Sequence, residues 1–164
     1  MELEGYDVNL TGLDSINSLI NRFDKFDQES DKMFDEALFD GAAVVADEVK
    51  SKIESIPVEE KANGKPYWGT PNRKLTGITS IQKDGLRAGF GIASFRKEGN
   101  STTTAIGFDG YNANGEPNQM IARVVESGNS FRQKRPFMRP AMNAAKGRAE
   151  EAMKKKILEK AKEI

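Results

Sequence analysis

Apolar residues recur at steps of three and four over residues 30–56, and this spacing predicts a long amphipathic helix. The apolar stripe starts at Phe34, and most charged side chains fall off it. Pro57 is expected to stop the helix, because proline lacks a backbone N–H and clashes with the preceding turn. A shorter amphipathic helix is predicted over residues 11–26, with Thr11 as its cap.

The middle of the chain alternates apolar and polar residues and predicts β-structure. Residues 78–82 form a short β-branched run, and residues 86–92 and 102–108 alternate with a period of two. Residues 97–100 are expected to form a hairpin turn between two strands. An antiparallel sheet of three or four strands, with one face packed on the long helix, follows from this pattern.

Two more helices are predicted in the last third. Pro117 can open a short helix that Gly128 closes, although residues 121–125 could also form a strand. Residues 140–163 are rich in Ala, Lys and Glu and predict a C-terminal helix with a narrow face of small residues. Such a helix can dock closely on a partner, and its far end could protrude.

These elements predict an α+β fold: a long N-terminal helix, a small antiparallel sheet and a C-terminal helix. At 164 residues the chain is long enough for one core. We therefore expect a single domain over residues 30–164, preceded by a helical extension over residues 1–29.

Composition removes whole classes of chemistry. The chain has no cysteine and no histidine, which excludes disulfides, thiolate nucleophiles, histidine triads and zinc sites built from those ligands. We therefore expect no enzyme and no cofactor. The acidic start lacks the apolar core of a signal peptide, and no apolar run approaches the ~20 residues that span a bilayer, so a soluble intracellular protein is expected.

The net charge is zero, but the two parts of the chain differ in sign. Residues 1–60 hold 16 acids and 5 bases, and residues 61–164 hold 9 acids and 20 bases. Either copies of the chain attract one another head to tail, or the two parts fold together and their charges cancel.

Four groups of residues are candidates for chemistry or binding. Gly89 and Gly91 match no phosphate-binding pattern, and Asp24, Asp27 and Asp31 lack the spacing of a calcium loop, so a solvated acidic face is the simpler interpretation. A basic cluster near two phenylalanines could contact a subunit, a partner or nucleic acid, and an aromatic pair lies in the loop over residues 57–74. The candidate contact residues are Arg132, Lys134, Arg135, Arg139, Tyr67 and Trp68.

The closing third carries a motif of its own. Val-Val-Glu-Ser-Gly-Asn at residues 124–129 is followed by a basic loop and by Arg-Pro-Phe-Met-Arg-Pro-Ala-Met at residues 135–142. Upstream lie Lys-Leu-Thr-Gly-Ile-Thr-Ser-Ile at residues 74–81 and Thr-Ala-Ile-Gly-Phe at residues 104–108. In this order the segments resemble the minor tail-component, or tail-completion, family of long-tailed double-stranded DNA phages.

The resemblance implies a structural protein of the head–tail junction, or neck. Such a protein assembles as a ring in the virion, between connector or stopper and tail terminator proteins, after synthesis in the host cytoplasm. DNA passes through the lumen without sequence-specific binding. A nucleic-acid-binding protein that uses the loop over residues 131–139 and the terminal helix is the alternative. The motif residues, expected to be structural, are Thr76, Gly77, Gly128, Pro136, Phe137 and Pro140.

Overall fold

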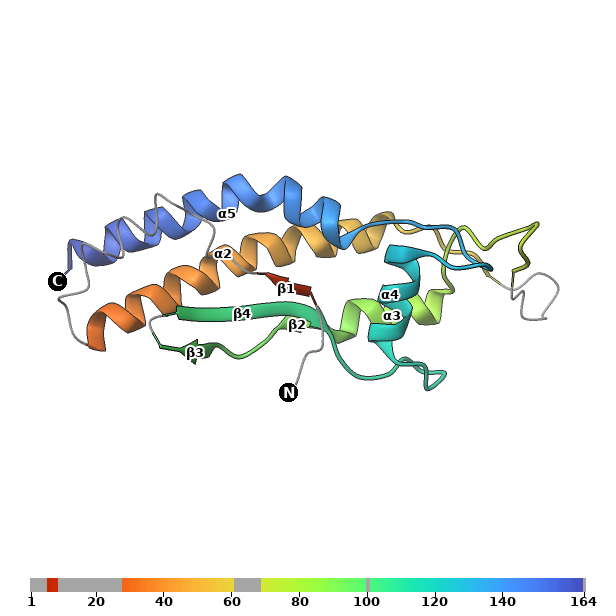
Figure 1. Ribbon diagram of the computed structural model, residues 1–164, viewed down its shortest axis with the longest axis horizontal. Helices are drawn as coiled ribbons and strands as arrows, with labels where there is room; N and C mark the ends of the chain where they lie inside the picture. The colour runs from red at the N-terminus through yellow and green to blue at the C-terminus, as the bar shows by residue number, and fades with distance from the viewer. Residues whose placement is uncertain (1–5, 9–27, 61–68, 100, 164) are drawn as a thin grey trace.

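A computed structural model describes residues 6–8, 28–60, 69–99 and 101–163. Its helices and strands form an α+β fold, elongated along two long helices (Figure 1). In chain order they are β1 (Tyr6–Val8), α2 (Gln28–Ser55), α3 (Ser80–Gly89), β2 (Phe90–Ile92), β3 (Arg96–Glu98), β4 (Ser101–Phe108), α4 (Asn118–Ser127) and α5 (Met138–Ala161).

The helices α2 and α5 lie antiparallel along most of their length, and α2 separates α5 from the sheet (Figure 1). Three alanines one turn apart on α5 are fully buried: Ala141, Ala145 and Ala149. A side chain at Gly41 of α2 would meet the Met153 thioether at 2.7 Å, so the two backbones approach closely. The predicted small-residue docking face is confirmed, and the far end of α5 is also packed, because Ile157 is buried.

The small sheet is built around β4. Strands β1, β2 and β3 each pair antiparallel with it, in registers that include Tyr6 opposite Ile106 and Glu98 opposite Ser101. Ile106 is fully buried and belongs to the same apolar cluster as Val49 of α2. The predicted sheet is confirmed. Its β1 strand comes from the segment for which a helical extension was expected, whereas the predicted helix over residues 11–26 lies outside the described residues.

The predicted strand at residues 78–82 is wrong, because α3 begins at Ser80. Of the predicted strand at residues 86–92, the first part is wrong because α3 extends to Gly89, and the second part is confirmed as β2. Its start is a capping box: the Thr79 hydroxyl accepts from the Gln82 amide at 3.2 Å, and the Gln82 side chain accepts from the Thr79 amide at 3.1 Å. Buried Lys83 also donates to the carbonyl oxygens of Glu54 and Ile56 and so closes the end of α2. Capping and helix packing therefore outweigh the local β propensity.

The remaining elements follow the pattern. Helix α2 ends just before Pro57, β4 covers the predicted strand over residues 102–108, and α4 ends at Gly128 as expected. The turn between β3 and β4 includes Gly99 with a φ of +58°. No helix among the described residues is long and apolar enough to cross a membrane.

Candidate interaction surface

The segment that leads into α5 is rigid and anchored in the core. Phe137 and Met138 are buried, and the Phe137 ring meets the ring of Phe108 edge-on at a centroid distance of 6.0 Å. Pro136 and Pro140 flank them and are exposed. Two fixed φ angles on either side of a buried aromatic hold the path of the chain where α5 begins.

A buried carboxylate on α4 caps the start of α5. Glu126 accepts hydrogen bonds from the backbone amides of Phe137 (2.7 Å), Met138 (2.9 Å) and Arg139 (3.1 Å). The first amides of a helix have no partner within the helix and form its positive end, so a carboxylate there satisfies them and complements the dipole. Glu126 therefore fixes α5 relative to α4.

The loop between α4 and α5 folds back tightly on α4. Gly128 has a φ of +67°, and a Cβ there would lie 2.7 Å from the Lys134 backbone nitrogen. The Arg135 amide donates to the Val125 carbonyl oxygen at 2.8 Å. The backbone at Arg135 therefore lies against the C-terminal end of α4.

The Thr76–Gly77 pair is structural. The Glu59 carboxylate accepts from the amides of Thr76 (2.7 Å) and Gly77 (2.9 Å) and from the Thr76 hydroxyl (3.3 Å). Burial acts to raise the pKa of Glu59, but these hydrogen bonds and the charge of Arg132 outweigh it and lower the pKa. A Cβ at Gly77 would lie 2.3 Å from the Pro57 carbonyl oxygen, so only glycine fits there.

Arg132, an expected contact residue, lies half-buried in this same layer. Its guanidinium donates to the Gly77 carbonyl oxygen, and its backbone lies next to Leu75 in a short parallel bridge. Burial lowers the pKa of Arg132, and the nearby charges of Glu59 and Glu116 oppose that shift. Its observed contacts join the loop to the body of the protein.

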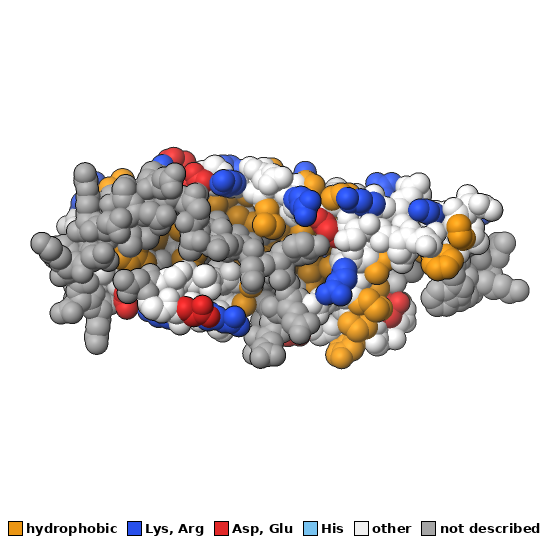
Figure 2. Space-filling view, in the orientation of Figure 1, with side chains coloured by type: hydrophobic (Ala, Val, Ile, Leu, Met, Phe, Trp, Pro, Cys, Tyr) orange, Lys and Arg blue, Asp and Glu red, His pale blue; other side chains and the backbone are white. Residues whose placement is uncertain are grey.

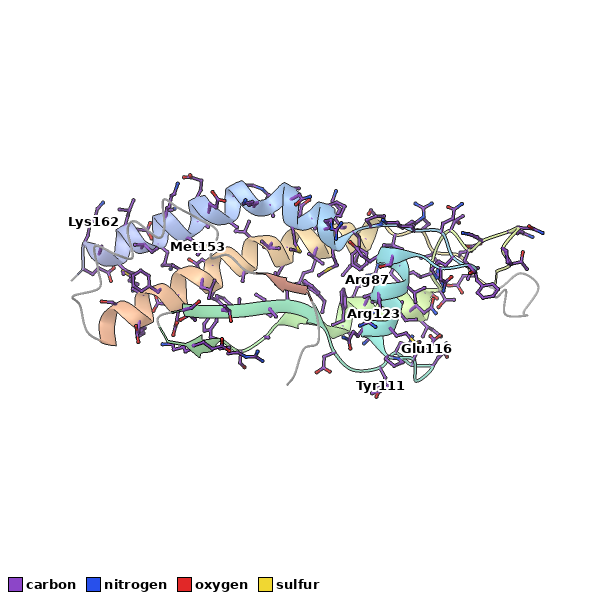
Figure 3. The ribbon with its side chains drawn as sticks, viewed as in Figure 1. Arg87, Tyr111, Glu116, Arg123, Met153 and Lys162 are labelled. Atoms are coloured by element: carbon purple, nitrogen blue, oxygen red, sulfur yellow. The ribbon has the colours of Figure 1, made fainter. Side chains whose placement is uncertain are left out.

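Among the other expected contact residues, Lys134, Arg135 and Arg139 are exposed and form no ion pair within the described residues, whereas Tyr67 and Trp68 lie outside them. Figure 3 shows Arg123, Tyr111 and Glu116 at the end of the molecule that holds α3 and α4, while Met153 and Lys162 lie toward the opposite end, and Arg123 is exposed. The end that holds α3 and α4 therefore presents cations to solvent.

The acidic and basic parts of the chain meet within one molecule along the α2–α5 pair. The cations Arg148, Lys156 and Lys160 of α5 pair with Glu48, Asp40 and Glu36 of α2 at 2.8, 3.3 and 3.7 Å. At the sheet, Lys97 pairs with Asp35 at 3.3 Å, and this contact raises the pKa of the lysine. Of the two charge arrangements considered, the intramolecular one is present along these helices.

No group of three or more potential metal-ligating side chains occurs among the described residues. Asp31, one of three acids considered for a metal site, instead lies 3.6 Å from the Lys97 ammonium, and Asp24 and Asp27 fall outside the described residues.

Sequence reasoning missed two carboxylates on which this end depends. Glu126 and Glu59 act on backbone amides that are distant in the sequence, and no local spacing marks such a contact. Glu126 does fall inside the Val-Val-Glu-Ser-Gly-Asn segment, so the motif pointed to the right place without giving the reason.

Comparison with protein families finds a match over much of the chain. The family described as "Bacteriophage HK97-gp10, putative tail-component" matches residues 17–128, more than half of the chain. The match includes α2, the sheet strands β2 to β4 and α4, and it ends at Gly128, before the proline-bracketed segment. No curated protein and no solved structure matches the chain.

Proposed function

Because the chain belongs to the HK97-gp10-like family of bacteriophage tail components, we propose that it serves as a structural part of the head–tail junction. It is a phage structural protein, and its place in the neck is our proposal. There it forms a ring on assembly, between connector or stopper proteins on one side and the tail terminator on the other. DNA passes through the lumen without sequence-specific contacts.

The observation that carries this proposal is the build of the α4 end. Glu126 and the bracketing prolines give α5 a fixed start, and the exposed cations Lys134, Arg135 and Arg139 lie directly before and after that start in the chain. Rigid presentation lowers the entropy lost on association, which suits a protein that acts by forming interfaces. The chemistry we propose is protein association, without catalysis.

A phage carrying an amber codon in this gene tests the proposal. In a non-suppressing host we expect filled heads and separate tails, seen by electron microscopy of the lysate, and we expect joined particles once the protein is supplied in trans. Cryo-electron microscopy of the rescued particles should place the chain as a ring in the neck. Normal yields of joined particles in the non-suppressing host would overturn the proposal.

A further inference from the structure

The outer face of α4 and the loop before it carry a line of apolar side chains. Tyr111 is 72% exposed and Met120 is 48% exposed. Tyr111 lies opposite Pro117 in a short antiparallel bridge, and Val124 lies one turn after Met120 on the same helix face. Figure 2 shows a continuous hydrophobic run over this end of the molecule. We name Tyr111, Pro117, Met120 and Val124 the α4 ridge.

One cation lies on the same face of α4 as the ridge, and three more follow where the chain returns to the C-terminal end of α4. Arg123 lies on the same helix face, between Met120 and Val124 in the sequence. Three more cations follow on the chain that folds back on α4: the Arg135 amide bonds to Val125, and the Arg139 amide bonds to Glu126. None of the four forms an ion pair within the described residues. We name Arg123, Lys134, Arg135 and Arg139 the basic rim.

The charges elsewhere argue against a second copy of this chain as the occupant. The α2 carboxylates Glu36, Asp40 and Glu48 already pair with α5 of the same molecule. Glu54 is also occupied, because it accepts two hydrogen bonds from Arg87 at 2.6 Å. The described helices therefore offer few free carboxylates to the basic rim of a neighbouring copy, which favours a different protein as the source of an acidic segment.

The apolar component argues against nucleic acid. Phosphate binding rewards lysine and arginine and gains little from methionine and valine side chains. A protein segment with apolar residues on one side and carboxylates beside them matches both features, since buried apolar contact supplies affinity and the charges supply orientation and association rate.

We propose that the α4 ridge and the basic rim form a docking site for an acidic amphipathic segment of another virion protein. Apolar side chains of that segment pack on Met120 and Val124, and its carboxylates pair with Arg123 and Arg135. This inference rests on the proposed function, because a junction protein must bind neighbours other than itself.

A designed peptide tests the chemistry directly on the full chain. The probe is a fluorescein-labelled helix of about 18 residues with leucines along one face and glutamates elsewhere. We expect saturable binding by fluorescence anisotropy, weakened as salt is raised from about 50 to about 300 mM. Met120→Asp and Arg123→Glu should each weaken it by about tenfold or more.

Matched variants on α5 control for altered charge and exposure. The exposed fraction of Leu158, 51%, is similar to that of Met120, 48%. Lys146 is exposed and forms no ion pair within the described residues. Leu158→Asp and Lys146→Glu should change the affinity by less than about twofold. Circular dichroism melts of every variant confirm that the site variants remain folded.

Any of three results would overturn the docking site. The first is equal binding of a sequence-scrambled peptide, and the second is binding of duplex DNA that is tighter than that of the peptide and is weakened by the ridge variants. The third is self-association in sedimentation velocity that Met120→Asp abolishes. The outcome is separable from that of the amber experiment. If the peptide fails to bind while the amber phage still yields unjoined heads and tails, the docking site falls and the junction role stands. If the amber phage assembles normally, the junction role falls.

Discussion

The two ends of the molecule handle charge in opposite ways. Along the α2–α5 pair, the α5 cations Arg148, Lys156 and Lys160 meet carboxylates of α2, and the seam between the helices is closed by alanines. At the α4 end, the basic rim stays without ion pairs within the described residues, and its Arg123 shares a face of α4 with exposed Met120. Three cation–carboxylate pairs join the two long helices, whereas the basic rim has no such partner within the described residues. This difference is the reason why we propose the α4 end as the surface that binds other proteins.

The largest effect is expected where the two regions join, at Glu126. Glu126→Ala leaves three amides at the start of α5 without an acceptor, and a buried donor left unpaired costs about 1–3 kcal/mol. We expect a loss of about 3 kcal/mol or more in the free energy of unfolding, measured by urea denaturation. Glu151→Ala, at an exposed position on α5, is the control and should cost under about 0.5 kcal/mol. Equal stability of the two variants would show that α4 does not hold α5.

A second substitution breaks the packing beneath the α4 end. Gly77→Ala places a Cβ against the Pro57 carbonyl oxygen, and the backbone must shift. We expect destabilisation of about 1–3 kcal/mol in thermal melts, the range for an overpacked site. Gly91→Ala is the matched control, because a Cβ at Gly91 meets no atom within 4 Å, and it should leave the melting temperature nearly unchanged. If Gly77→Ala changed stability as little as Gly91→Ala, the close approach of Gly77 to the Pro57 carbonyl oxygen would be contradicted.

Charge-reversal substitutions compare the two regions through smaller changes in the free energy of unfolding. Arg148→Glu sets two carboxylates together at an exposed pair, which should cost about 0.5–1 kcal/mol, and the added Glu48→Arg change should restore most of it in a double-mutant cycle. Arg135→Glu at the α4 end should change stability by less than about 0.5 kcal/mol. A larger stability loss for Arg135→Glu than for Arg148→Glu would reverse the contrast between the two regions.

The smallest expected effect is the dependence of stability on acidic pH through Glu59. The folded-state pKa of Glu59 lies below its ordinary value of 4.5, so its contribution to stability is present above 4.5 and is lost as the pH falls through the lowered value. The gap in melting temperature between the wild type and Glu59→Gln should therefore be widest near neutral pH and close on acidification. Glu98→Gln, at an exposed position of β3, should show no such gap, and a gap for Glu59→Gln that stays constant with pH would refute the assignment.

Periodicity predicted the long-range frame well, because α2 and α5 bury faces that repeat regularly in the sequence. It failed at α3, where Leu86 and Ala88 continue the period-two pattern of β2 but belong to a helix that a capping box at Thr79 begins. Periodicity could not predict the capping roles of Glu59 and Glu126, because each carboxylate accepts from amides more than ten residues away in the sequence. The basic cluster was found in the sequence, but the separation of half-buried Arg132 from its exposed neighbours required the fold.

The carboxylate cap also has a mechanical consequence. The Glu126 carboxylate accepts hydrogen bonds from three successive amides in the first turn of α5. Separating α4 from α5 would therefore require all three bonds to break together. Beyond that cap, α5 runs for 24 residues along α2. A displacement of α4 would therefore reach the α2–α5 pair through the start of α5.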